Sequence, residues 1–169
     1  MKFKSLLLLS VIALFSSCSI PRNKAAGYED KITGSITITI STTCQLSECV
    51  EWSNNLETNL IAKFKEQGIQ ANVTQLGYTS KEAYMRDTKI KDNYILHIEQ
   101  IKDMVRYKVP GNSSSSNSHD GIFVITLFDR KINKEVWKAE IWANFYSYNT
   151  NPKTFSTALI KILKEDNLL

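Results

Sequence analysis

The order of hydrophobic periods along the chain constrains its fold more than any other feature. In residues 34–41, isoleucines alternate with hydroxyl side chains, which is the pattern of a half-buried strand rich in β-branched residues. From Ser47 to Gln67 the apolar residues recur every three or four positions, as on an amphipathic helix that ends at Gly68. A second strand is predicted over 69–76. Strand, helix and strand in this order predict two parallel or nearly parallel strands joined by the helix.

The remaining predicted elements are strands separated by polar turns, followed by one more helix. Three strands are predicted over residues 94–109, 122–128 and 135–147. A serine-rich surface loop is expected at 112–120, and Asn151 can cap a last helix with Pro152 in its first turn. The sequence therefore predicts an α+β domain over 34–169. We expect a two-layer sandwich, in which one mixed sheet of about five strands carries two helices on one face.

Residues 1–17 are predicted to be a signal peptide that is removed. Lys2 and Lys4 precede an apolar stretch from Leu6 to Phe15, and small residues follow it. This stretch is too short to span a bilayer core, which needs about 20 residues. Without Lys2 and Lys4, 19 of the 21 basic side chains remain against 17 acidic ones. The chain has no block of Lys and Arg residues, so we expect no nucleic acid as a partner.

The residues Leu14-Phe15-Ser16-Ser17-Cys18 resemble a bacterial lipobox. The resemblance implies that the Cys18 thiol is acylated and that cleavage occurs before Cys18, so that palmitate-type chains anchor the protein in a membrane. Ser19, in place of Asp, resembles an outer-membrane sorting signal and implies an outer-membrane lipoprotein that faces the periplasm. The alternative is an ordinary secretory signal that leaves Cys18 as a spare thiol. Residues 18–33 show no hydrophobic period and are expected to form a lipidated tether.

Cys44 and Cys49 are the other two cysteines of the chain. In an oxidising envelope, two cysteines this close together are expected to form a disulfide that ties the first strand to the first helix. Two alternatives remain. Cys49 falls on the apolar stripe of the helix, which also suits buried free thiols, and metal or redox chemistry is the third possibility.

The face of the sheet away from the helices is the predicted contact surface. Alternate residues of the last strand place Trp142 and Tyr146 there, close to Tyr148, and the neighbouring strand adds Ile122 and Val124. Exposed aromatic groups mark surfaces that contact a partner, a membrane or a ligand. The alternative is that they pack against the serine-rich loop. Trp142, Tyr146 and Tyr148 are thus the candidate partner-binding residues.

Residues 121–139 resemble a hairpin found in small bacterial envelope lipoproteins, several of unknown function. Its features are an apolar strand, Asp129, a basic turn, and the pair Val136-Trp137 followed by a small residue. The layout of such proteins is similar to the TolB amino-terminal domain and to lipopolysaccharide-assembly lipoproteins. The resemblance implies an accessory or assembly role and carries over no catalytic residue.

Catalytic motifs are not apparent in the sequence. His119 and Asp120 lie beside serines, but adjacent residues in a serine-rich loop are not held as a hydrolase triad, and no nucleophile turn is present. We therefore predict no catalytic residue, no metal site and no cofactor. The favoured function is a non-enzymatic outer-membrane lipoprotein that binds an envelope protein or a lipid-linked glycan. The alternative is a periplasmic small-ligand-binding protein or enzyme with its site between the sheet and residues 77–93.

Overall fold

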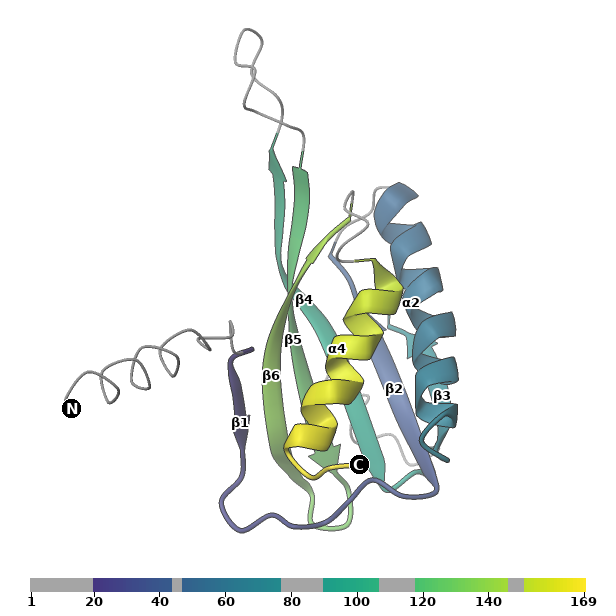
Figure 1. The fold of residues 1–169 in the computed structure, drawn as a ribbon, viewed down its shortest axis with the longest axis vertical. Coiled ribbons are helices and arrows are strands. Elements are labelled where there is room, and N and C mark those ends of the chain that lie inside the picture. The colour runs from purple at the N-terminus through teal and green to yellow at the C-terminus, as the bar shows by residue number, and fades with distance from the viewer. Residues whose placement is uncertain (1–19, 44–46, 77–89, 107–117, 146–150) are drawn as a thin grey trace, which may run out of the picture.

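One open six-stranded sheet carries two helices on one of its faces (Figure 1). The computed structural model describes residues 20–43, 47–76, 90–106, 118–145 and 151–169. The helices are α2 (Ser47–Lys65) and α4 (Pro152–Glu165). The strands are β1 (Arg22–Lys24), β2 (Ser35–Ser41), β3 (Gln70–Gln75), β4 (Tyr94–Arg106), β5 (Ser118–Asp129) and β6 (Lys134–Asn144). The predicted α+β class, with both helices on the same face, is confirmed.

The strands lie in the order β1-β6-β5-β4-β2-β3, which makes the sheet mixed. Strand β2 pairs in parallel with both β3 and β4, so that Ile38 lies opposite Val73 on one side and Leu96 on the other. The remaining pairs are antiparallel, and β5 and β6 form the hairpin expected from the sequence. The parallel arrangement of β2 and β3 around α2 is as predicted.

Both helices are held by their apolar stripes and by local end signals. Gly68 follows α2 with a φ of 74°, a left-handed conformation that glycine adopts without steric cost. Asn151 caps α4, because its side-chain oxygen accepts a hydrogen bond from the N–H of Thr154 at 2.9 Å. The stripes of the two helices pack against β-strand residues at the centre of the core.

An aromatic cluster joins the helices to the sheet at one end of the core. The Trp52 ring of α2 stacks on Phe123 of β5, with ring centroids 5.0 Å apart. Its edge contacts are with Phe145, at 5.3 Å, and with Phe155 of α4, at 5.4 Å. Offset and edge-to-face contacts of this kind add to the burial of the rings themselves. Three elements that are distant in the chain therefore meet at one indole ring.

The expected irregular tether is wrong in part, because residues 18–33 contain β1. This strand pairs antiparallel with the outer edge of β6, where Arg22 lies opposite Ala139 and Lys24 lies opposite Trp137. A strand of three residues is too short to show a period of two, so the sequence pattern could not reveal it. The sheet consequently has six strands where about five were expected, and the folded domain begins before residue 34.

Side chains of this segment bind the end of α4. Arg22 forms ion pairs with Glu165, at 2.6 Å, and Asp166, at 3.3 Å. The ammonium group of Lys24 donates to the main-chain oxygen of Asp166 at 2.8 Å. Ile32 is 3% exposed and packs in the core. The N-terminal segment is thus fixed to the domain by packing and by cations placed at a helix C-terminus.

The expected serine-rich loop at residues 112–120 is wrong for its last three residues. Ser118, His119 and Asp120 belong to β5, where all three pair with β4 and Asp120 also pairs with β6. Residues 112–117 lie outside the described part of the chain. The long β4–β5 ladder extends beyond the helices, as Figure 1 shows, so that polar residues continue a strand whose apolar period has already ended.

We predict that Trp52→Ala lowers the free energy of unfolding by about 3–5 kcal/mol, because it leaves a cavity between α2, α4 and β5. Val50 provides a control on the same helix, since its side chain is 50% exposed. Val50→Ala should change the stability by no more than about 0.5 kcal/mol. Urea denaturation followed by circular dichroism measures both values. Equal effects of the two substitutions would contradict the proposed packing.

Candidate binding surface on the helix-free face

Strand alternation divides the sheet residues between two environments. On β6, the helix side carries Trp137, Ala139, Ile141 and Ala143, all of which are at most 6% exposed. The other face of this strand carries Lys138, Glu140, Trp142 and Asn144. The register places Val124 of β5 opposite Glu140, and Ile122 opposite Trp142. The helix-free face is therefore formed by the second set of side chains, as the sequence predicted.

An apolar patch extends across the neighbouring strands β4, β5 and β6 on this face, and we call it the open-face patch. Its exposed members are Ile101 and Trp142, with the half-buried Val124 and the buried Ile122 between them on β5 and Pro21 at the edge. Trp142 is 56% exposed and Ile101 is 53% exposed, which are the two highest exposures among the large hydrophobic residues described. The indole N–H of Trp142 donates to Glu140 Oε1 at 3.3 Å. The apolar surface of the ring is thus left toward solvent while its polar group is satisfied.

A shallow groove runs from the patch to the edge of the sheet. It has a volume of about 460 Å³ and is lined by Pro21, Arg22, Asn23, Ile101, Val124, Lys138, Ala139 and Glu140. Ile101 lies at a bulge, where the register between β4 and β5 shifts between Gln100 and Lys102. A bulge re-aims the side chains of an extended strand. The groove therefore depends on β1 and on the bulge, neither of which the sequence pattern revealed.

The structure places only one of the three predicted partner-binding residues. Trp142 is exposed on the predicted face. Tyr146 and Tyr148 lie outside the described residues. Ile101 and Pro21 were not predicted, and the signal that could have identified Ile101 was an apolar residue between polar neighbours on a long strand.

The predicted cysteine sites lie largely outside the described residues. Cys18 and Cys44 both fall there, so acylation and the Cys44–Cys49 disulfide remain predictions. Cys49 is buried on α2, as its place on the apolar stripe indicated. Its sulfur lies 3.8 Å from each ring nitrogen of His119.

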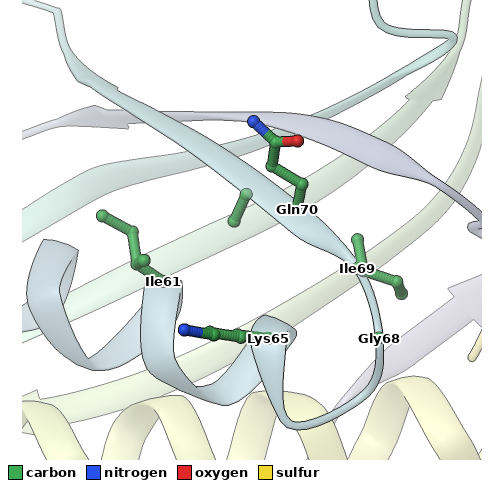
Figure 2. Close-up of a pocket in the computed structure, with 6 residues that line it drawn as sticks. Ile61, Lys65, Gly68, Ile69 and Gln70 are labelled. Atoms are coloured by element: carbon green, nitrogen blue, oxygen red, sulfur yellow. The ribbon is translucent and has the colours of Figure 1, made fainter.

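A second groove lies at the opposite edge of the sheet, between α2 and β3 (Figure 2). It measures about 350 Å³ and is lined by Ile61 and Lys65 of α2, by Gly68 and Ile69 of the connection, and by Gln70 and Ala71 of β3. This is not the ligand site that we considered between the sheet and residues 77–93. Most of that segment, residues 77–89, lies outside the described part of the chain, and the ligand site there stays an alternative prediction.

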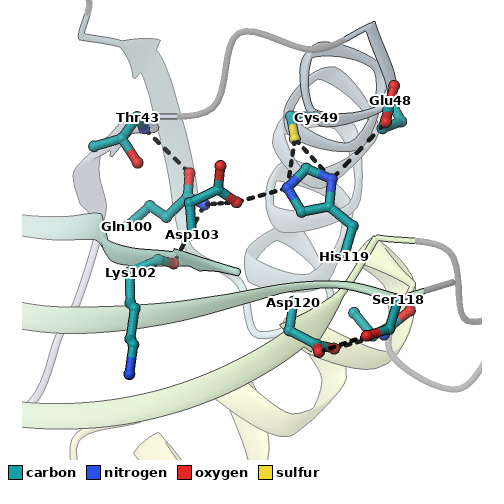
Figure 3. A network of polar contacts seen from close by, with 10 residues as sticks. Thr43, Glu48, Cys49, Gln100, Lys102, Asp103, Ser118, His119 and Asp120 are labelled. Atoms are coloured by element: carbon teal, nitrogen blue, oxygen red, sulfur yellow. Dashed lines mark hydrogen bonds and ion pairs between the residues drawn. The ribbon is translucent and has the colours of Figure 1, made fainter. Parts of the chain in front are cut away.

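A buried polar network surrounds His119 at the base of the extended β4–β5 ladder (Figure 3). The His119 ring is fully buried, and Nε2 lies 2.6 Å from Asp103 Oδ1. Glu48 Oε1 is 3.9 Å from Nδ1, on the opposite side of the ring. Gln100 extends the network, since its amide donates to Asp103 at 3.3 Å and its oxygen accepts from the N–H of Thr43 at 3.1 Å.

The His119 network connects structural elements and does not form the hydrolase triad that we rejected. His119 pairs with Asp103 of the adjacent strand, whereas Asp120 accepts hydrogen bonds from Ser118, at 3.2 Å, and Asn144. Consecutive strand residues point to opposite faces, so His119 and Asp120 cannot act on one substrate atom. In the described residues, no group of three His, Cys, Asp or Glu side chains is placed to hold a metal ion. His97 is likewise buried, with Nδ1 at 2.7 Å from Thr39 Oγ1.

Asp92 is the centre of a second polar cluster, beside the start of β4. Its carboxylate accepts hydrogen bonds from Ser35, from Thr37 at 2.6 Å and from Asn72 at 3.2 Å. Burial raises the pKa of Asp92, but the three hydrogen bonds outweigh this effect and hold the pKa below its ordinary value. The cluster ties β2, β3 and the approach to β4 together on the helix-free face.

We predict that the stability of the protein falls as the pH is lowered below about 4 and that Asp92 contributes to this loss. A carboxylate with a lowered pKa in the folded state stabilises the protein above the unfolded-state pKa, and this contribution is lost as the pH falls through the folded-state value. Asp92→Asn should therefore flatten the pH dependence of the unfolding free energy. Thr37→Val removes one donor and should give an intermediate slope. A slope unchanged in Asp92→Asn would contradict the assignment.

No helix in the described residues has the length and hydropathy needed to cross a membrane. No family model and no curated protein sequence matches the chain.

Solved structures share the fold at low sequence identity. A PelC dodecamer from Paraburkholderia phytofirmans, a variant with one leucine-to-methionine substitution, is 12% identical, with a TM-score of 0.53 over 89% of this chain and 100% of that one. A second PelC dodecamer from the same organism is 11% identical, with a TM-score of 0.51 over 86% of this chain and 94% of that one. The lipoprotein GNA1162 from Neisseria meningitidis is 12% identical, with a TM-score of 0.46 over 79% of this chain and 97% of that one. The two PelC likenesses show a common fold.

Proposed function

We propose that this chain is a lipid-anchored binding protein of the bacterial envelope that acts through the open-face patch and catalyses no reaction. The observation that carries the proposal is the exposure of Trp142 and Ile101, each more than half accessible, at one place on the helix-free face. Exposed apolar groups gathered in this way are typical of contact surfaces.

The N-terminal sequence supports the anchored location. Residues 1–18 resemble a lipoprotein signal that ends in a lipobox, and this resemblance supports an acylated Cys18 at the start of the mature chain. With two or three acyl chains the anchor holds the protein at the membrane for practical purposes permanently, because each buried CH₂ contributes about 0.8 kcal/mol. The outer membrane, with the domain in the periplasm, is the location that Ser19 favours.

The polar clusters support a binding role over catalysis. His119 and Asp92 are both engaged with side chains of neighbouring elements, and the His119 ring is fully buried. Catalytic acids and bases must reach a substrate atom within hydrogen-bonding distance. The open-face patch, by contrast, is accessible and apolar, which suits recognition of another envelope component.

We predict that Cys18→Ala abolishes incorporation of a labelled fatty acid and releases the protein from membranes. The acyl chains attach through the Cys18 thiol, so no anchor can form without it. Metabolic labelling and membrane fractionation measure the two effects, and Cys49→Ala is the control that should retain both label and membrane association. Acylation that persists in Cys18→Ala would disprove the anchor.

We predict that a photo-crosslinking residue captures envelope components from position 142 and not from position 50. Replacing Trp142 with p-benzoylphenylalanine places the reactive group in the patch, whereas Val50 is comparably exposed on α2, at 50% against 56%. Irradiation of intact cells, followed by mass spectrometry of the adducts, distinguishes protein, glycan, lipid and a second copy of the chain. Similar adduct yields from both positions would contradict a patch-specific function.

A further inference from the structure

We propose that the open-face patch rests on membrane lipid, with Trp142 and Ile101 inserted at the interface between headgroups and acyl chains. This inference depends on the proposed anchor at Cys18 and names the partner of the same patch. It follows from where β1 fixes the start of the chain, and from the chemistry of the side chains that surround the patch.

The length of chain between the anchor and the sheet is the first step of the argument. Three residue steps separate Cys18 from Pro21, which lines the groove. A fully extended chain covers at most about 3.6 Å per residue, so the Cys18 Cα lies within roughly 11 Å of the Pro21 Cα. The expected tether of residues 18–33 would have let the domain stand away from the membrane. Pairing of β1 with β6 removes most of that freedom.

The direction of β1 is the second step. The N–H of Glu140 donates to the carbonyl oxygen of Pro21 at 2.9 Å, which continues the antiparallel register by one residue. Because the strands are antiparallel, the N-terminal end of β1 lies toward the Trp142 end of β6. Trp142 is two residues beyond Glu140 on the same face, roughly 7 Å along the strand. The chain therefore enters the sheet beside the patch.

The other groove is too distant to share this position. Strands β1 and β3 occupy opposite edges of the six-stranded sheet. Five interstrand spacings of about 4.8 Å separate them, which amounts to roughly 24 Å. Lipid chains attached to Cys18 thus lie close to the open-face patch and far from the groove beside β3.

The side chains of the patch suit a lipid interface. A tryptophan ring has an apolar body and a polar N–H, and it prefers the boundary between headgroups and acyl chains. Ile101 adds a branched apolar side chain beside the groove. Lys102 and Lys138 are exposed on the same face, where their ammonium groups can reach lipid phosphates while their methylene stems cover apolar surface. An exposed indole, an aliphatic neighbour and flanking lysines are typical of interfacial contacts, and the carboxylate of Glu140 on this face accepts the hydrogen bond of the Trp142 indole N–H.

Intrinsic tryptophan fluorescence tests the proposal with little modification of the protein. The chain has three tryptophans. Trp52 and Trp137 are 4% and 2% exposed, whereas Trp142 is 56% exposed. The acylated protein is purified from membranes and reconstituted into vesicles of phosphatidylethanolamine and phosphatidylglycerol whose acyl chains are brominated near the headgroup. Bromine quenches an indole only at close range, so the difference in emission between the wild type and Trp142→Phe isolates the contact of Trp142 with lipid.

We expect the Trp142 component to fall about twofold or more in brominated vesicles relative to unbrominated ones, and to become protected from acrylamide in the water phase. Trp142→Phe should show little bromine quenching, because its two remaining indoles are buried in the core. Flotation of the same vesicles reports the anchor separately. Protein that floats with an unquenched, acrylamide-accessible Trp142 would overturn this inference and leave the proposed binding function intact. Protein that does not float would overturn the anchor and the inference together.

Discussion

One-sided packing of the sheet is the constraint on which the rest of the structure depends. Each helix has a single apolar stripe, and both stripes are buried against the same face, where Trp52 joins α2, α4 and β5. When helices cover only one face of a sheet, the other face must carry polar side chains that form hydrogen bonds, or apolar side chains that a partner can cover. Both solutions occur here, although Ile95 of β4, on the same face, is apolar and fully buried. The Asp92 and His97 clusters occupy the part over β2, β3 and β4, while the open-face patch occupies the part over β4, β5 and β6.

The fixed N-terminal segment gives this division a functional meaning. Arg22 and Lys24 bind the end of α4, and Ile32 is buried, so the segment is held at both the edge of the sheet and the core. Tyr28 contributes as well, since its hydroxyl donates to Asp129 at 2.9 Å, and burial together with this carboxylate raises the pKa of Tyr28. Because this segment is held by so many contacts, the domain cannot turn freely relative to a group attached at the N-terminal end of the segment. In the anchored state that we propose, an acyl group on Cys18 would determine which face of the sheet meets the membrane.

The sequence predicted those parts of the fold that rest on repeated hydrophobic spacing. Ile36, Ile38 and Ile40, the stripe of α2 and the cap at Asn151 each provide several agreeing signals, and all are confirmed. The sequence did not predict strand β1, because its three residues show no hydrophobic period. Their strand conformation depends on pairing with β6, which is far away along the chain. The sequence did not predict the strand at Ser118–Asp120, because these polar residues extend a β4–β5 pairing whose apolar residues lie further along β5. The exposure of Trp142 was predictable from alternation, whereas the position of Ile101 depends on a bulge. Local patterns therefore identified the face that carries the site, and tertiary pairing determined its composition.

The central claim is that the helix-free face, around Trp142, is the surface in contact when the protein is in its membrane. Hydroxyl-radical footprinting tests it most directly. The protein is oxidised in native outer-membrane vesicles and, for comparison, in a solution with few detergent molecules per protein. We predict that oxidation of Trp142 and Ile101 falls severalfold in the vesicles while oxidation of Val50 and Ile61 on α2 is unchanged, because these two side chains, 50% and 40% exposed, lie on the helix side. Equal oxidation of Trp142 and Ile101 in vesicles and detergent, or protection of α2 instead, would contradict the account.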